Sequence, residues 1–174
     1  STYKVRRAEC DELAGMAAGP FGIAKLADVR DEALRRAIDE RFRATHPGHC
    51  DRLAYIFEAQ ERFYRMLKAW RKGDIATVGE IFRQDGIGLR DKYRISGPEL
   101  ETMCDIARSV PGALGERMLG GGDKGASGAL VKAAAVGALR KAVETGYPRS
   151  YPDYAGKFAV HECRVVDGVA SLDF

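Results

Sequence analysis

The sequence contains no long hydrophobic run, and no window approaches the roughly 18 uninterrupted apolar residues that a membrane-spanning helix needs. Residues 1–15 carry too many charges for a secretory signal. None of the four cysteines lies in a C-x-x-C pair, the spacing typical of zinc-binding and thiol-exchange motifs. We therefore expect a reduced, cytoplasmic protein with ordinary buried thiols.

The sequence also lacks an excess of one charge. Its 28 basic and 25 acidic residues give a net charge of +3, without a block of like charge or a basic stripe interleaved with aromatics. This disfavours nucleic acid and membrane surfaces as partners. With 45% hydrophobic residues, the 174 residues are typical of one globular domain, which we place over residues 1–174.

The first two thirds of the chain have the apolar spacing of amphipathic helices. The predicted helices span residues 3–18, 33–42, 50–71, 75–84 and 96–110. Gly19-Pro20 is expected to end the first, and Ser96 with Glu99 is expected to form a capping box for the last. The longest predicted helix carries a stripe that we expect to lie in the core: Leu53, Ile56, Phe57, Phe63, Tyr64, Leu67 and Trp70.

After Pro111 the sequence changes character. Short runs at 113–119, 126–132 and 157–166 have strand character, and residues 133–145 between the last two are an alanine-rich helix. Asp167-Gly168 predicts a hairpin turn into residues 169–172. Helices followed by a small, mostly antiparallel sheet indicate the α+β class.

The segment GGGDKG, residues 120–125, matches G-x-G-x-x-G literally. The dinucleotide-binding motif requires a strand before it and a helix directly after it, whereas a strand is predicted next here. No glycine is followed by Lys and then Ser or Thr, so a Walker loop is excluded as well. Two interpretations remain: a tight turn that needs positive φ values, or bare backbone amides that approach an anion or ligand.

Four segments, taken in order, resemble the C-terminal half of galactokinases in the GHMP family of small-molecule kinases. Residues 1–10 are similar to S-x-Y-x-x-R-R-x-x-C, and Glu58, Arg62 and Gly73-Asp74 to E-x-x-R…G-D. Residues 89–100 are similar to L-R-D-x-Y-x-V-S-x-P-E-L, and residues 115–122 to G-x-R-M-T-G-G-G. The shared order and spacing make the resemblance specific.

The resemblance implies the GHMP kinase C-terminal domain, a ferredoxin-like core with extra helices. It implies a two-lobed kinase that transfers the γ-phosphoryl group of ATP to the anomeric hydroxyl of galactose with Mg²⁺. In that family the catalytic Asp and Arg and the P-x-x-x-G-L-S-S-S-A loop belong to the N-terminal lobe, and this sequence contains no such loop. We therefore expect no catalytic residue, bound ATP or Mg²⁺ in this chain alone, and no activity without an N-terminal lobe.

The resemblance also implies site residues. Tyr3 corresponds to a tyrosine whose hydroxyl contacts the sugar, and Gly120, Gly121 and Gly122, with Asp123 and Lys124, correspond to the loop that closes the active site. Five positions depart from the family pattern: Gly88 replaces Ser, Leu119 replaces Thr, Asp123 replaces Phe, Lys124 replaces Gly and Ala126 replaces Cys. These departures leave the sugar, and activity itself, open.

Other polar residues are expected to have structural roles. Arg90, Asp91 and Tyr93 should provide an ion pair and packing at a helix end. Glu58 and Arg62, one turn apart, should form a weak surface pair. His46, His49 and Cys50 have metal-ligand chemistry but no fourth ligand nearby, so exposed loop histidines are expected rather than zinc.

Two functions follow from the resemblance. The first is the C-terminal lobe of a galactokinase-like kinase, whose partners are a sugar and an N-terminal GHMP lobe in the same or a separate chain. The alternative is a non-catalytic module on the same fold that binds a sugar or nucleotide, or regulates another protein.

Overall fold

The computed structural model describes residues 1–122 and 125–164, and it confirms the α+β order of helices followed by a small antiparallel sheet. The helices of this part are α1 (Thr2–Phe21), α2 (Glu32–Phe42), α3 (Pro47–Arg71), α4 (Ile75–Gly88), α5 (Pro98–Arg108) and α6 (Val136–Ser150). The strands are β1 (Ala113–Leu119) and β2 (Ala126–Val131). Short helical turns complete it: η1 (Leu26–Asp28), η2 (Leu89–Tyr93), η3 (Ala133–Ala135) and η4 (Pro152–Tyr154).

Local signals in the sequence set several helix ends. The Asp31 carboxylate accepts a hydrogen bond from the Leu34 amide at 2.8 Å and begins α2. Gly73, with φ of 70°, follows the end of α3, and the Asp74 carboxylate then caps α4 at the Thr77 amide. These caps explain why the boundary between the two helices was predictable.

Three features predicted from the sequence are wrong, apart from shifts of a few residues at other helix ends. The first helix continues to Phe21 with Pro20 in its last turn, and it ends at Gly22, whose φ is 67°. Ser96 caps nothing, because Pro98 takes the first position of α5 and Gly97 becomes the N-cap. Residues 157–164 form no strand, and the Val160 carbonyl accepts from Arg140 of α6 instead of from a neighbouring strand. The predicted hairpin at Asp167-Gly168 lies outside the described residues.

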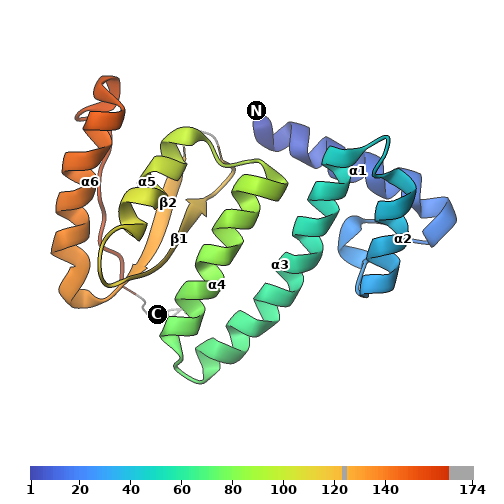
Figure 1. Ribbon diagram of the computed structural model, residues 1–174, viewed down its shortest axis with the longest axis horizontal. Helices are drawn as coiled ribbons and strands as arrows, with labels where there is room; N and C mark the ends of the chain where they lie inside the picture. The colour runs from blue at the N-terminus through green and yellow to red at the C-terminus, as the bar shows by residue number, and fades with distance from the viewer. Residues whose placement is uncertain (123–124, 165–174) are drawn as a thin grey trace, which may run out of the picture.

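The sheet lies between α4 on one side and α5 and α6 on the other (Figure 1). β1 and β2 pair antiparallel, from Ala113 opposite Val131 to Leu119 opposite Ala126. Glycines on α4 allow its close approach to β1, because a Cβ on Gly79 would lie 2.6 Å from Leu114 Cβ. The buried Glu116 of β1 accepts hydrogen bonds from Arg83 of α4 and Arg108 of α5, so it fixes the sheet to both neighbours.

The main apolar core joins α1, η1, α2 and the first half of α3 at the other end of the molecule (Figure 1). Its fully buried members include Leu13, Ala17, Val29, Ile38 and Leu53. The prediction that the whole aromatic stripe of α3 is core is wrong. Leu53 and Phe57 are buried, whereas Phe63, Tyr64, Leu67 and Trp70 are exposed, because α1 and α2 cover only the first half of α3. No helix in the described ranges is both long and apolar enough to cross a membrane.

Candidate functional site

The three consecutive glycines form the turn that follows β1. Gly120 and Gly122 have φ values of 77° and 84°, a region that favours glycine. A Cβ on Gly121 would meet nothing within 4 Å. Asp123 and Lys124, the remaining predicted residues of this loop, lie outside the described residues.

Gly122 packs directly on Ile95, the residue that follows η2 and Arg94. A Cβ on Gly122 would lie 2.7 Å from Ile95 Cγ1 and would also overlap the Ile95 carbonyl. Ile95 is itself buried in a small cluster with Leu89, Leu100 and Met118. The glycine turn is therefore seated on a packed segment at the edge of the core.

The segment beneath the turn has an unusual backbone. η2 is a single π-helical turn that extends α4, and Arg94 after it adopts a left-handed conformation with φ of 53°. A hydrogen bond of 3.1 Å from the Ile95 amide to the Leu89 carbonyl closes the turn. Single π-helical turns are frequent at functional sites, and a positive φ at a residue other than glycine stores strain.

The first turns of α1 attach to the same segment. Arg6 Nε donates to the Arg94 carbonyl at 3.0 Å, and Cys10 Sγ lies 3.8 Å from the Tyr93 hydroxyl. Burial raises the pKa of Tyr93, and the neighbouring Cys10 and Tyr3 raise it further. Tyr3 is about half exposed at the start of α1. The structure thus brings the segment that bears Tyr3 and the glycine turn to adjoining residues, Tyr93 to Ile95.

Buried charges hold α1 against η2. The guanidinium of Arg52, on α3, is almost fully buried and donates to Glu9 at 2.8 Å and to the Lys92 carbonyl. Arg6 binds the other Glu9 oxygen at 2.6 Å. Sequence reasoning missed Arg52, because nothing in its spacing separates it from the exposed cations of the same helix.

A second charged cluster lies where α3, α4 and β1 meet. Arg62 Nε lies 3.1 Å from Asp85 Oδ1, and Arg117 of β1 binds the other carboxylate oxygen. Glu58 contacts Arg62 at 3.3 Å and also pairs with Lys92. The predicted pair of Glu58 and Arg62 forms, but the prediction that it lies on the surface is wrong for Arg62, because α4 and β1 bury Arg62 against Asp85.

The other predicted residues occupy separate places. Arg90 and Asp91 form the expected ion pair at 2.7 Å, and the Tyr93 ring packs on Tyr55 at 5.0 Å between centroids, which confirms their structural roles. The prediction for His49 is wrong, because it lies in the first turn of α3, half-buried, with Nε2 2.9 Å from Glu12. In the described ranges no group of three His, Cys, Asp or Glu side chains is placed to hold a metal.

Two of the departures from the family pattern have visible surroundings. Leu119, at the end of β1, lies over β2, and a Cβ on Gly128 would lie 2.8 Å from its Cδ1. Gly88 is buried at the end of α4, where a Cβ would lie 3.0 Å from the Tyr55 ring and 3.2 Å from Arg62 Nη2. Arg62 Nη2 has no hydrogen-bond partner, so a hydroxyl at position 88 would lie beside an unsatisfied donor.

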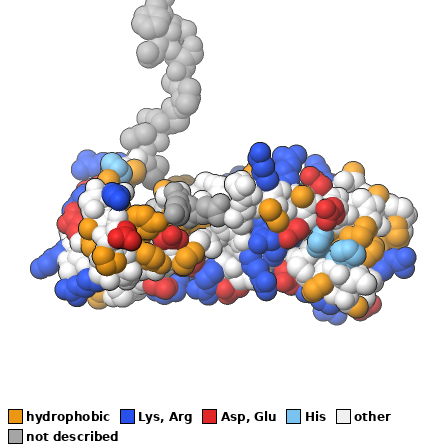
Figure 2. All heavy atoms as spheres, turned by 90° about the horizontal axis from the view of Figure 1, so that it is seen from above, with side chains coloured by type: hydrophobic (Ala, Val, Ile, Leu, Met, Phe, Trp, Pro, Cys, Tyr) orange, Lys and Arg blue, Asp and Glu red, His pale blue; other side chains and the backbone are white. Residues whose placement is uncertain are grey.

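The edge that carries η2 and the glycine turn is the face seen in Figure 2. Lys and Arg side chains gather across its middle, between apolar clusters toward its two ends. Backbone amides of a glycine turn, a half-exposed phenol and nearby cations suit the hydroxyls of a sugar or the oxygens of an anion.

Comparisons with known proteins give the family of part of this chain. Residues 66–149 match the family model described as GHMP kinases C terminal. These residues are a GHMP kinase C-terminal domain. The galactokinase of Streptomyces coelicolor is 37% identical over 150 residues, which cover 83% of this chain and 36% of the relative. The galactokinase of Roseiflexus sp. is 30% identical over 177 residues, covering 99% of this chain and 42% of the relative.

A solved structure agrees with these relatives. The galactokinase of Lactococcus lactis, complexed with galactose, superposes with a TM-score of 0.74 at 28% identity. The match covers 87% of this chain and 38% of that protein. The chain therefore spans less than half of the galactokinases that it matches, and it has the fold of their C-terminal lobe.

Proposed function

We propose that this chain is the C-terminal lobe of a sugar kinase that phosphorylates galactose, or a related sugar, at the anomeric hydroxyl with ATP and Mg²⁺. The observation that carries the proposal is the convergence of the α1 segment and the glycine turn on residues 93–95. Both segments match galactokinase motifs, and both face one edge of the molecule.

In this proposal Tyr3 contacts the sugar, and the turn of Gly120, Gly121 and Gly122, continued by Asp123 and Lys124, closes the cleft. The second wall, with the nucleotide and the catalytic groups, comes from an N-terminal GHMP lobe. Phosphoryl transfer depends on positioning and on stabilising charge around the phosphates. A lobe that supplies binding groups from one side should therefore be inactive by itself.

The test compares the chain alone with a fusion that places the N-terminal part of the Streptomyces coelicolor galactokinase before Ser1. ADP release from ATP with galactose should be absent for the chain alone and measurable for the fusion. In the fusion, Tyr3→Phe should raise KM for galactose more than it lowers kcat, because the hydroxyl binds the sugar rather than reacting.

Turnover by the unfused chain would contradict the need for a second lobe. A folded fusion that binds galactose by calorimetry without turnover would favour the alternative, a non-catalytic sugar-binding module. The next variants would then return two positions to the family pattern, Leu119→Thr and Lys124→Gly, and would be assayed for turnover.

A further inference from the structure

The second half of α3 exposes large apolar side chains that no described part of the chain covers. Phe63, Tyr64, Leu67 and Trp70 are 37–63% exposed, and we call them the aromatic face of α3. Positions 63, 67 and 70 lie on neighbouring turns of one side of the helix, with Tyr64 beside them. Single exposed apolar residues are ordinary, but a contiguous row of four indicates an interaction surface.

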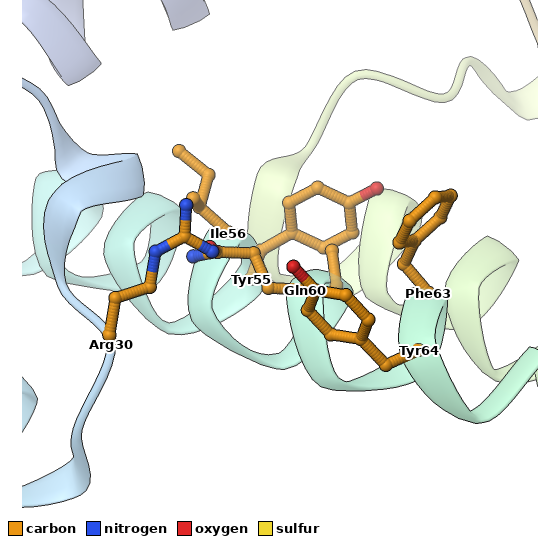
Figure 3. Close-up of a pocket in the computed structure, with 7 residues that line it drawn as sticks. Arg30, Tyr55, Ile56, Gln60, Phe63 and Tyr64 are labelled. Atoms are coloured by element: carbon orange, nitrogen blue, oxygen red, sulfur yellow. The ribbon is translucent and has the colours of Figure 1, made fainter.

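The aromatic face is hollowed on both sides of Tyr64. One hollow, of about 400 Å³, lies between Tyr64, Ile56 and Arg30, and Figure 3 shows the Arg30 side chain reaching from the loop before α2 toward α3. The other, of about 570 Å³, lies between Tyr64, Leu67 and the cations at the end of α3. The two hollows follow one another along the helix, and Tyr64 lines both of them.

Cations stand at both ends of this surface. Arg30 lines the first hollow, and Lys68, Arg71 and Lys72 line the second. None of these four side chains forms an ion pair with a described residue, and no carboxylate is among the residues that line either hollow. Negative charge at both ends of an occupant would therefore strengthen its binding to the aromatic face.

This charge pattern separates the candidate occupants. A second copy of the chain would bring the same cations against each other, which opposes association. A flat anionic membrane would meet the charges but would leave two hollows unfilled. An amphipathic helix can place apolar side chains one or two turns apart in successive hollows, and a four-turn helix matches the roughly 22 Å from Ile56 to Arg71.

We propose that the aromatic face of α3 binds an acidic amphipathic helix of another protein. Its apolar anchors enter the two hollows, and its carboxylates pair with Arg30 at one end and with Lys68, Arg71 and Lys72 at the other. The second hollow lies away from the glycine turn, since α3 ends where α4 begins and the turn packs at the far end of α4. The first hollow reaches closer to the turn, because Tyr55, which lines it, packs on Tyr93 of η2.

Trp70 makes a direct test possible, because it is the only tryptophan in the sequence. The probe is a synthetic peptide of about 16 residues, with leucines on one helical face and glutamates beside them. One control peptide has the same composition with the leucines dispersed, and another replaces glutamate by lysine. Only the acidic amphipathic peptide should shift Trp70 emission to shorter wavelength, and added salt should weaken its binding.

Charge variants test the contacts at the end of α3. Lys68→Glu combined with Arg71→Glu should weaken the peptide at least about tenfold, since two attractive charges become repulsive. Lys141→Glu combined with Arg149→Glu, which reverses two exposed cations on α6, is the matched control and should leave the affinity unchanged. All four side chains are exposed, so circular dichroism should show an unchanged fold.

Several results would overturn the proposal. The first is a Trp70 emission that does not change with the acidic peptide. The second is an equal emission shift with the dispersed or lysine peptides. The third is a double variant that binds the acidic peptide as tightly as the unsubstituted chain. A Trp70 response only to phosphatidylserine vesicles would identify a membrane surface instead. Dimerisation that protects Trp70 from acrylamide would identify a second copy, and the same protection in the fusion protein would identify the N-terminal lobe. None of these outcomes depends on whether the fusion phosphorylates galactose.

Discussion

Arg62 of α3 and Asp85 of α4 lie 3.1 Å apart, Nε to Oδ1, with only 10% and 11% of their side chains exposed. The same carboxylate binds Arg117 of β1 and accepts from the Tyr55 hydroxyl at 3.3 Å. One carboxylate therefore connects two helices and the first strand of the sheet.

Removal of the Asp85 carboxylate should destabilise the folded protein. We expect Asp85→Ala to lower the free energy of unfolding by about 3–5 kcal/mol, because it leaves Arg117 without a carboxylate and the buried Arg62 with Glu58 alone. Asp91→Ala is the matched control: its pair with Arg90 is largely exposed and should contribute less than about 1 kcal/mol. Urea unfolding followed by circular dichroism measures both, and equal losses would show that Asp85 is better solvated than its contacts indicate.

Gly88 stands where the family pattern has Ser, and a substitution there tests whether the surroundings still accept a side chain. A side chain there would press on the Tyr55 ring, so Gly88→Ser should lower stability by about 1–3 kcal/mol. In a Tyr55→Leu background the loss should shrink, because the new hydroxyl can accept a hydrogen bond from the unsatisfied Arg62 Nη2.

A double-mutant cycle in urea gives the coupling between positions 55 and 88, which we expect to be on the order of 1 kcal/mol. Gly15→Ser is the control for helix propensity alone, since a Cβ on Gly15 of α1 would meet nothing within 4 Å. Strict additivity of the two substitutions would show that the Tyr55 ring does not determine the residue at position 88.

The sequence predicted most elements of the fold because their signals are local. The limits of β1 and the end of α3 follow from strand character, Gly73 and Asp74. Burial was less predictable. The apolar stripe of α3 predicts that one side of the helix is buried. It cannot predict that α1 and α2 cover this side only in the first half of α3 and leave Phe63 exposed. The burial of Arg52 and Arg62 was not predictable either. Their carboxylate partners lie up to 43 residues away in the chain, so no local pattern indicates them.

The candidate site was predictable in its parts and not in its assembly. The glycines and Tyr3 stand out in the sequence through motif and resemblance. Their convergence depends on η2 and the left-handed Arg94, and no local pattern predicts a π-helical turn. The close approach of Gly122 to Ile95 is likewise a tertiary contact between segments that are far apart in the chain.

Gly121 and Gly122 are neighbours, but the structure requires glycine at only one of the two positions, 122. Gly122→Ala should destabilise the protein by about 1–3 kcal/mol, because it combines a positive φ with overlap onto the Ile95 carbonyl. Gly121→Ala should change stability by less than about 0.5 kcal/mol, because nothing surrounds that position. Thermal unfolding of both variants is the measurement, and similar melting temperatures would show that the turn is not seated on Ile95.

Glu9 gives the fold a dependence on pH at the α1–η2 contact. Burial raises the pKa of its carboxyl, but hydrogen bonds from Arg6 and Arg52 outweigh that effect, so the pKa in the folded protein is lowered. A carboxylate with a lowered pKa stabilises the fold at any pH above its unfolded value of about 4.3. That contribution disappears as the pH falls through the folded pKa.

We therefore expect Glu9→Gln to be less stable than the natural chain by a constant amount at pH values above about 5. Below about pH 4.3 the difference should shrink, because protonation of Glu9 gives the natural chain the same neutral side chain. Urea unfolding at neutral pH and at two acidic values measures the gap. This difference in the free energy of unfolding could instead stay constant down to pH values at which Glu9 is protonated. That result would mean that the new amide disturbs packing around Arg52 and that the charge of Glu9 contributes little.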